Sequence, residues 1–317
     1  MGRRVCRHSS KSASPDGKIR EKNWIVVVAF CVQKLSKFDE NIEITLNVLS
    51  NINDDQVQSY QQLIAFYHAH KEKVFSKIFV ELREWFSANL CAALGAILDE
   101  FVDNLNNVEF SFIDPQIESI LQKNDFLTYF GKSQMIDAYM TTIRYQKLQP
   151  IDGKYFKNYV IAELMEGRIT EYMNVAGGVK EKIGESICEI FNNAQMHSES
   201  KYIYSCGQFY PAKNKIVFTI VDRGIGFRDR INRTFGSHLN SVQAIKWAVK
   251  DKTTTKKISG GIGLAILREF VETNGGKMQI VSKDGFYQFT RGGEYTRIFQ
   301  DEFPGTIVNL QFRTDFI

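Results

Sequence analysis

Glu189 and Asn193 combine residue types and a spacing that could do chemistry on a bound metal ion. They lie four residues apart in the stretch EIFNNAQMHS, positions 189–198, and residues four apart share one side of a helix. A carboxylate and an amide oxygen on one helix face can hold Mg²⁺ and orient a water beside it, because Mg²⁺ prefers oxygen ligands and keeps several waters. Adjacent asparagines are poor helix formers, so the pair either faces solvent as a polar flank or coordinates a ligand.

Asp222 ends an apolar strand in the stretch VDRGIGF, where Gly224 and Gly226 follow it. A carboxylate at this place can accept a hydrogen bond from an exocyclic amine. The two glycines let the backbone turn sharply and approach a flat ring closely. The alternative is an ordinary turn with a solvated aspartate.

A second glycine cluster opens a later apolar helix. The stretch SGGIGLAI contains Gly261, Gly263 and Leu264. Free backbone N–H groups and the helix dipole at such a start favour a phosphate, although a plain helix that begins after a linker has the same composition. Farther along the chain, FPGTIVNLQF begins a late strand with Gly305 and Thr306.

The elements that must position these motifs follow from hydrophobic periodicity. Apolar residues at helical spacing predict a helix at about 179–198, which carries the first motif. The pattern also predicts a helix that Gly275 and Gly276 stop. The other predicted elements are a helix at LNSVQAIKWAVK, strands at SKYIYSCGQF and KIVFTIVD, and four final strands at KMQIVS, GFYQFT, YTRIFQ and GTIVNLQF.

Taken in order, the four motifs resemble the nucleotide site of the gyrase, heat-shock chaperone, histidine kinase and mismatch-repair (GHKL) ATPase superfamily, over about residues 150–317. Four linked motifs in one order are far more specific than any one of them. The resemblance implies the Bergerat fold, an α/β sandwich with a mixed, largely antiparallel sheet and helices on one face. It also implies ATP and Mg²⁺ as ligands, bound beneath a mobile lid at about 227–260.

The resemblance also implies a role for each motif residue. Asn193 would bind Mg²⁺, and Glu189, one turn earlier, would act as the catalytic base. Asp222 would accept the adenine amine with help from Thr306. Gly224 and Gly226 would line the base. Gly261, Gly263 and Leu264 would bind the phosphates. The polar lid residues would be Thr254, Thr255, Lys256 and Lys257.

Two positions depart from the family pattern. Met196 stands just before the histidine of the first motif, where kinase members usually carry Lys or Arg, so a direct phosphate contact from this helix is lost. Ser259 stands where many members have the first glycine of the phosphate motif. With both changes we still expect nucleotide binding, but catalysis is less strongly expected.

The first half of the chain has the pattern of a smaller α/β domain. Strand, helix, strand and helix alternate between KIFVEL and DPQIESILQKNDFL, where Asp114 and Pro115 start the last helix as N-cap and first residue. At about residues 75–131 this order resembles the STAS fold of anti-sigma-factor antagonists. Ser87 would then be a possible phosphoacceptor; the alternative is that it caps the helix that follows.

Composition and the positions of Pro and Gly predict three segments. Pro150 and Gly153 mark the best boundary, so we expect a disordered basic tail at 1–23, a STAS-like α/β domain at 24–148 and a GHKL ATP-binding domain at 149–317. Residues 1–23 hold seven Lys or Arg and two Asp or Glu, a net charge of +5, whereas the whole chain carries +4. The body is therefore slightly acidic, which does not fit a nucleic-acid-binding protein.

The cysteines and the longest apolar run indicate the compartment. The five cysteines are scattered without a CxxC pair, as is usual in a reducing cytosol. The longest apolar run, WIVVVAFCV, is too short to span a bilayer and fits a buried strand. We therefore expect a cytoplasmic protein that does not bind a membrane.

The whole pattern resembles bacterial proteins that join a STAS-like module to a GHKL domain. We expect an ATP-binding regulator in signal transduction that hydrolyses ATP or phosphorylates a Ser or Thr of a protein partner, itself a small STAS-like or sigma-factor-like protein. The alternatives are a non-catalytic, ATP-gated interaction switch and an atypical protein histidine kinase. A homodimer is also left open.

Overall fold

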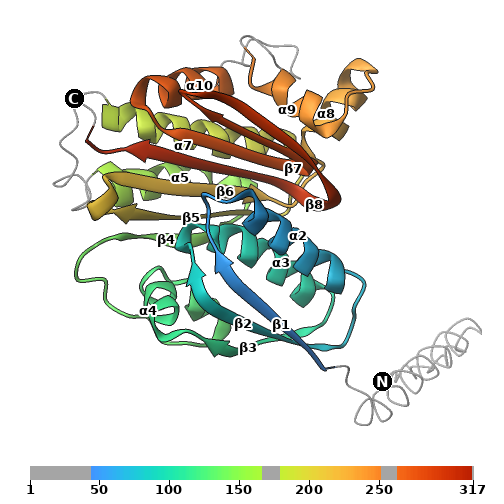
Figure 1. Ribbon diagram of the computed structural model, residues 1–317, viewed down its shortest axis with the longest axis vertical. Helices are drawn as coiled ribbons and strands as arrows, with labels where there is room; N and C mark the ends of the chain where they lie inside the picture. Colours follow the sequence, from blue (N-terminus) through green and yellow to red (C-terminus); the bar gives the residue numbers. More distant parts are fainter. Residues whose placement is uncertain (1–43, 166–178, 251–262, 316–317) are drawn as a thin grey trace, which may run out of the picture. The chain divides into compact units, whose positions relative to one another are not determined.

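Two β-sheets organise the part of the chain that the structure, a computed structural model, describes: residues 44–165, 179–250 and 263–315 (Figure 1). The larger sheet has the strand order β4-β5-β6-β8-β7, and its neighbouring strands are antiparallel. The smaller sheet has the order β1-β2-β3, with β2 and β3 parallel. The strands are β1 (Ile44–Ile52), β2 (Lys77–Phe86), β3 (Asn107–Ile113), β4 (Thr142–Leu148), β5 (Ile203–Tyr210), β6 (Lys215–Asp222), β7 (Lys277–Thr290) and β8 (Gly293–Arg313).

Local sequence sets the start of helix α4. The Asp114 side chain accepts a hydrogen bond from the backbone N of Gln116 at 3.0 Å, and Pro115 is the first helical residue, as predicted. No helix in the described ranges is long and apolar enough to cross a bilayer. The helices are α2 (Val57–His70), α3 (Cys91–Asp103) with the short η1 (Ala88–Leu90) before it, α4 (Pro115–Lys123), η2 (Phe126–Phe130), α5 (Gly153–Val160), α7 (Val179–His197), α8 (Gly226–Phe235), α9 (Ser241–Ala248) and α10 (Gly263–Asn274).

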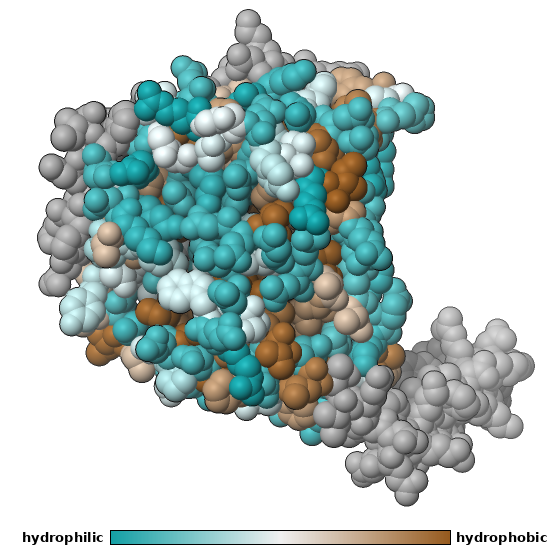
Figure 2. All heavy atoms as spheres, in the orientation of Figure 1, coloured by the Kyte–Doolittle hydropathy of each residue, from teal (hydrophilic) through white to brown (hydrophobic). Residues whose placement is uncertain are grey.

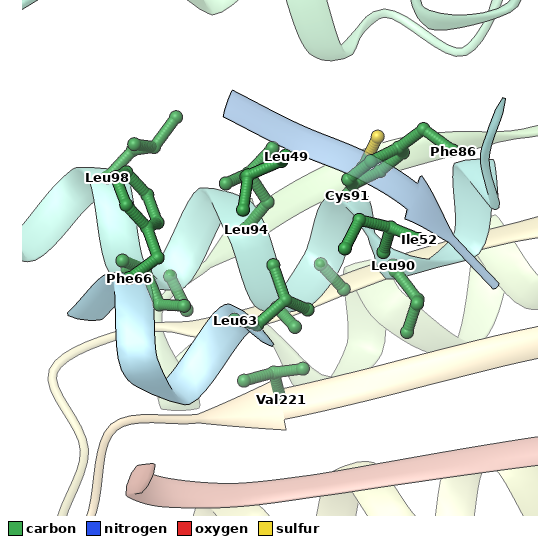
Figure 3. Close-up of a cluster of buried hydrophobic side chains, with 14 of the residues drawn as sticks. Leu49, Ile52, Leu63, Phe66, Phe86, Leu90, Cys91, Leu94, Leu98 and Val221 are labelled. Atoms are coloured by element: carbon green, nitrogen blue, oxygen red, sulfur yellow. The ribbon is translucent and has the colours of Figure 1, made fainter. Parts of the chain in front are cut away.

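Strand β6 lies inside the larger sheet, and all eight of its residues are buried. Ile216, Phe218 and Ile220 point to one face, where they join a hydrophobic cluster with residues of α5, α7 and α10. Thr219 and Val221 point to the opposite face, because successive side chains of a strand alternate. Val221 joins a second cluster with residues of α2 and α3 (Figure 3).

Both faces of the larger sheet are covered, whereas the family resemblance implied helices on one face only. Helices α5, α7 and α10 cover one face, and α2 and α3 cover the other, between the two sheets (Figure 1). The second face carries fully buried aromatic residues such as Tyr204, Phe286 and Phe303. Without the cover of α2 and α3 these rings would be exposed to water at a large cost.

The strands of the larger sheet differ from the predicted set in two ways. The four short strands expected after α10 are two long ones, β7 and β8, which pair as a hairpin. Strand β4 lies before the expected boundary at 148/149 but pairs with β5, so the larger sheet begins at Thr142. The described residues from Thr45 onward form one compact unit.

A chain of buried polar side chains joins the first half of the molecule to the larger sheet. The Tyr60 hydroxyl of α2 donates to Oε1 of Gln279 at 3.1 Å, and Nδ2 of Asn309 donates to the same oxygen at 2.8 Å. The Thr219 hydroxyl donates to Oδ1 of Asn309 at 2.8 Å, and Nδ2 of Asn89 donates to Thr219 at 2.9 Å. These five side chains fix how α2 and η1 sit on the sheet, because each loses a partner if the layers shift.

On the face seen in Figure 2, hydrophilic side chains predominate and hydrophobic ones lie in small separate groups. Most large apolar side chains are instead in the two clusters on either side of the larger sheet. The packing of these two clusters is therefore what holds the layers together.

Replacing Thr219 with Val should destabilise the protein by about 1–3 kcal/mol, because Asn89 and Asn309 each lose a buried partner while the side-chain shape is kept. Urea unfolding of both proteins measures the change. A matched control is Thr273→Val, whose hydroxyl bonds Glu269 O on an exposed helix face and which should change stability by less than about 0.5 kcal/mol. Equal effects of the two substitutions would contradict the importance of the network.

Candidate functional site

Asp222, Thr306 and Ser282 form a row across three neighbouring strands. The register pairs Asp222 of β6 with Thr306 of β8, and Thr306 with Ser282 of β7. All three residues are buried, and the two hydroxyl oxygens lie 3.2 Å apart. By strand alternation they point to the same face as Ile220, which α7 and α10 cover. The structure therefore brings together the two residues that were predicted to recognise adenine.

The turn after Asp222 is held to its surroundings by backbone hydrogen bonds. The backbone N–H of Gly224 donates to Oδ1 of Asp222 at 2.9 Å, and that of Ile225 donates to the carbonyl of Ser198, just past α7, at 2.9 Å. The N–H of Phe227 donates to the hydroxyl of Ser282 at 3.0 Å. The turn therefore connects the end of α7 with strand β7.

Both glycines of this turn are required by close contacts within the protein. A Cβ on Gly224 would lie 2.0 Å from the carbonyl oxygen of Ser198, which no side chain can tolerate. Gly226 has φ +72° and its Cβ would lie 2.9 Å from the Ser282 hydroxyl. The predicted contact of these glycines with a base stays a prediction, because they have a structural role without any ligand.

Burial raises the pKa of Asp222 from 3.8 to about 7. The Gly224 N–H and the positive charge of Lys283 oppose this rise, but they do not cancel it. Lys283 follows Ser282 at an irregularity in the β7–β8 pairing and has φ +55°. The carboxyl group is therefore poised to change its charge near neutral pH, as carboxyls at functional sites often are.

Helix α7 carries Glu189 and Asn193 on its partly buried flank. Between them Ile190 and Phe191 are buried, and the Phe191 ring stacks on Phe156 of α5 with centroids 4.1 Å apart. The helix packs against β6 and α10. Its C-terminal end meets the Asp222 turn, so Asn193 and Glu189 lie about 6 and 12 Å back from that end along the helix axis.

The phosphate and lid residues are described only in part. Helix α10 begins at Gly263, and Leu264 is buried in the cluster beneath α7 and α10. The predicted lid at about 227–260 includes α8 and α9, so its described part is largely helical; the Asn240 side chain caps α9 by accepting from Gln243 N at 2.9 Å. The residues outside the described ranges are Gly261, Thr254, Thr255, Lys256 and Lys257.

Ser87 occupies the N-cap position of η1, but its side chain makes no capping hydrogen bond. Its hydroxyl instead accepts from the backbone N of Asp54 and from Nε1 of Trp85, both at 3.2 Å. The residue is 1% exposed. A kinase could reach this hydroxyl only after local opening of the structure.

Several residues that build the site were not predicted. Ser282 escaped because it meets Thr306 only through the register of β7 with β8, which the sequence does not specify, and Lys283 follows it where that register shifts. Ser198 was quoted only as the end of the first motif, and its carbonyl gives no sequence signal. Arg223 sits inside the VDRGIGF stretch as an unassigned residue.

The described residues contain no group of three or more His, Cys, Asp or Glu that could hold a metal ion alone. A Mg²⁺ ion at Asn193 would thus need phosphate oxygens and waters as further ligands, which is how Mg²⁺ is usually bound. No protein-family model matches the chain, and no curated protein matches it in sequence. The resemblance to the GHKL superfamily therefore rests on the sequence motifs alone.

The raised pKa of Asp222 predicts a pH dependence of stability. Between about pH 4 and pH 7 the folded protein keeps a proton that the unfolded chain has released, so the free energy of unfolding falls as the pH rises through this window. Relative to Asp222→Asn, the wild type should lose up to about 4 kcal/mol over the window. Denaturant unfolding at both ends measures this difference, and a difference that is independent of pH would contradict the assignment.

Proposed function

We propose that this protein binds Mg²⁺-ATP where β6 and α7 meet and uses it to regulate a protein partner, in the manner of the GHKL superfamily. The observation that carries the proposal is the buried carboxyl group of Asp222, in register with Thr306 on the sheet face that α7 and α10 cover. A buried carboxylate needs hydrogen-bond donors. The exocyclic amine of adenine is such a donor.

Binding of adenine at Asp222 favours the ionised carboxylate. The amine donates a hydrogen bond that an ionised oxygen accepts more strongly than a protonated one. Because the pKa of Asp222 is about 7 without ligand, a fraction of the protein must release a proton when the base binds. Thr306, whose hydroxyl lies 3.2 Å from that of Ser282, supplies a second polar contact beside the base.

The phosphates and the metal ion are assigned to the neighbouring helices. Asn193 lies on α7, and α10 begins at Gly263. These helices pack against each other. The amide oxygen of Asn193 would bind Mg²⁺, and the free N–H groups at the start of α10 would bind phosphate oxygens.

Glu189 gives the site the means to catalyse a reaction. It lies one turn before Asn193 on the same flank, where it can take a proton from water or from the hydroxyl of a partner's Ser or Thr. The first case is ATP hydrolysis and the second is a protein kinase reaction. The partner that we favour is a small STAS-like or sigma-factor-like protein in the bacterial cytoplasm.

A non-catalytic, ATP-gated switch is the second candidate. The buried polar chain from Tyr60 to Asn89 ties the first half of the molecule to the sheet that carries Asp222. A ligand that shifts this sheet would also change the outer layer. The histidine kinase alternative has less support, because His68 and His70 are hydrogen-bonded to the carbonyls of Glu302 and Phe66.

Titration calorimetry should detect binding of Mg²⁺-ATP with proton release near pH 7. Asp222→Asn should weaken binding by about 1–3 kcal/mol, roughly 5- to 150-fold, because an amide places a donor beside the adenine amine. The variant should also abolish the proton release, which is read from titrations in buffers of different ionisation enthalpy. Asp315→Asn, an exposed control, should change neither quantity. Unchanged affinity in Asp222→Asn would exclude this residue as the base contact.

Glu189 and Asn193 should give separate phenotypes. Glu189→Gln should keep the affinity for Mg²⁺-ATP and lower phosphate release or transfer by about 10²–10⁴-fold. Asn193→Ala should weaken Mg²⁺-ATP binding itself. Glu272→Gln, exposed near the end of α10 and far from its start at Gly263, is the control and should alter neither. If Glu189→Gln signals normally and the wild type shows no turnover with a partner, the protein is a switch.

A further inference from the structure

Arg223 lies between Asp222 and Gly224 in the turn of the candidate site and points to the opposite face of the sheet. Its guanidinium reaches helix α3, where Nη2 lies 2.7 Å from Oδ2 of Asp103 and 3.5 Å from Oδ2 of Asp99. Nη1 lies 3.8 Å from Oε2 of Glu100. The Arg223 side chain is 12% exposed and Asp103 is 44% exposed, so the guanidinium is largely shielded from solvent while its nearest carboxylate stays partly open to it.

The carboxylates that hold Arg223 are themselves held in place. Asp99 accepts a hydrogen bond from the Tyr204 hydroxyl at 2.6 Å and also pairs with Lys147. Glu100 accepts from the Tyr67 hydroxyl of α2 at 3.0 Å. A guanidinium in such a preformed acidic group keeps one geometry, because moving it would leave a largely buried positive charge without its partners.

The backbone of Arg223 is fixed at the same time. Its N–H donates to the Ser200 hydroxyl at 3.0 Å. On the neighbouring strand, Gly305 packs so closely that a Cβ there would lie 1.9 Å from the carbonyl oxygen of Asp222. The side-chain anchor and the backbone contacts therefore act on the residue directly between the candidate base-binding carboxyl and the first glycine of the turn.

A second connection reaches the same turn from α2. Nε2 of His68 lies 2.7 Å from the carbonyl oxygen of Glu302, and the Glu302 side chain pairs with Arg228 of α8 at 2.9 Å. Helix α8 begins at Gly226, where the turn ends. Both ends of the Asp222–Gly226 turn are thus connected to helices of the first half of the chain.

We propose that Arg223 is a positioning residue that couples helix α3 to the nucleotide site. Its ion pairs with the α3 carboxylates set the backbone of the Asp222–Gly226 turn, so a change in the position of α3 alters the affinity for the base. The inference rests on the proposed function, because it describes the regulation of that same site. It goes further by naming the first half of the chain as the regulator and Arg223 with Asp103 as the contact.

The test compares Arg223→Gln, Arg223→Lys and Asp103→Asn with Arg83→Gln, a control that breaks an exposed pair with Glu81 on β2. Hydrogen exchange of the backbone amides of residues 222–227 is measured without nucleotide, and the affinity for Mg²⁺-ATP is measured by calorimetry. Arg223→Gln and Asp103→Asn should each speed amide exchange in the turn and weaken ATP binding about 5- to 50-fold. Arg223→Lys keeps the charge and should show a smaller change in exchange and in affinity. Arg83→Gln should change neither quantity.

A double-mutant cycle separates coupling from general destabilisation. If Arg223 and Asp103 act through their ion pair, the combined variant should bind ATP no more weakly than Arg223→Gln alone, so the effects are not additive. Additive effects, or unchanged turn exchange and ATP affinity in the folded variants, would overturn the proposal. If Arg223→Gln does not fold, the test rests on Asp103→Asn. This variant should fold, because the Asp103 side chain is 44% exposed.

The exchange measurement distinguishes this proposal from the proposed function. If the wild type binds no nucleotide, the proposed function fails, but faster exchange in the turn of Arg223→Gln still shows that Arg223 positions it. If the wild type binds ATP and the variants keep its affinity and turn exchange, the coupling fails and the nucleotide site stands.

Discussion

Burial of β6 on both faces is the constraint on which the rest of the structure depends. Its apolar residues on one face need the cover of α5, α7 and α10, and on the other face Thr219 and Val221 need the cover of α2, η1 and α3. The second face is partly polar, so apolar packing alone would not be enough there. The Asn89 amide nitrogen, the Thr219 hydroxyl and the Asn309 amide each have a defined partner there. The hydrogen bonds of Asn89 and Asn309 with Thr219 therefore determine where the outer layer can sit.

The same constraint explains why the end of β6 can serve two purposes. Successive residues of a strand point to opposite faces, so Asp222 faces α7 and α10 while Arg223 faces α3. One residue carries a carboxyl whose pKa is raised by burial, and the next carries a guanidinium held by carboxylates. The proposed base contact and an anchor to the first half of the chain are thus adjacent residues in the sequence, so the proposed regulation needs no intervening element.

Hydrophobic periodicity and cap residues predicted the elements whose ends and type are set by their own local sequence. Asp114 and Pro115 start α4 as predicted, and the first motif lies on the helix expected for it. Features that depend on distant contacts could not be predicted in this way. The cover of the second sheet face requires knowledge of what packs on Thr219 and Val221, and β7 and β8 were divided because their irregular pairing interrupts alternation near Lys283. Asp222 and Thr306 were predicted to act together from the resemblance, but Ser282 joins them only through strand register.

The most direct test of the central claim, recognition of a base by Asp222, is the ratio of affinities for ATP and inosine triphosphate. The two nucleotides differ at the adenine amine, which inosine replaces with a carbonyl oxygen. At a pH well above the Asp222 pKa of about 7, the carboxyl group is ionised. If it accepts from that amine, the inosine nucleotide should then bind at least about tenfold more weakly, because two acceptors face each other. Equal affinities, or no binding of ATP, would contradict the account.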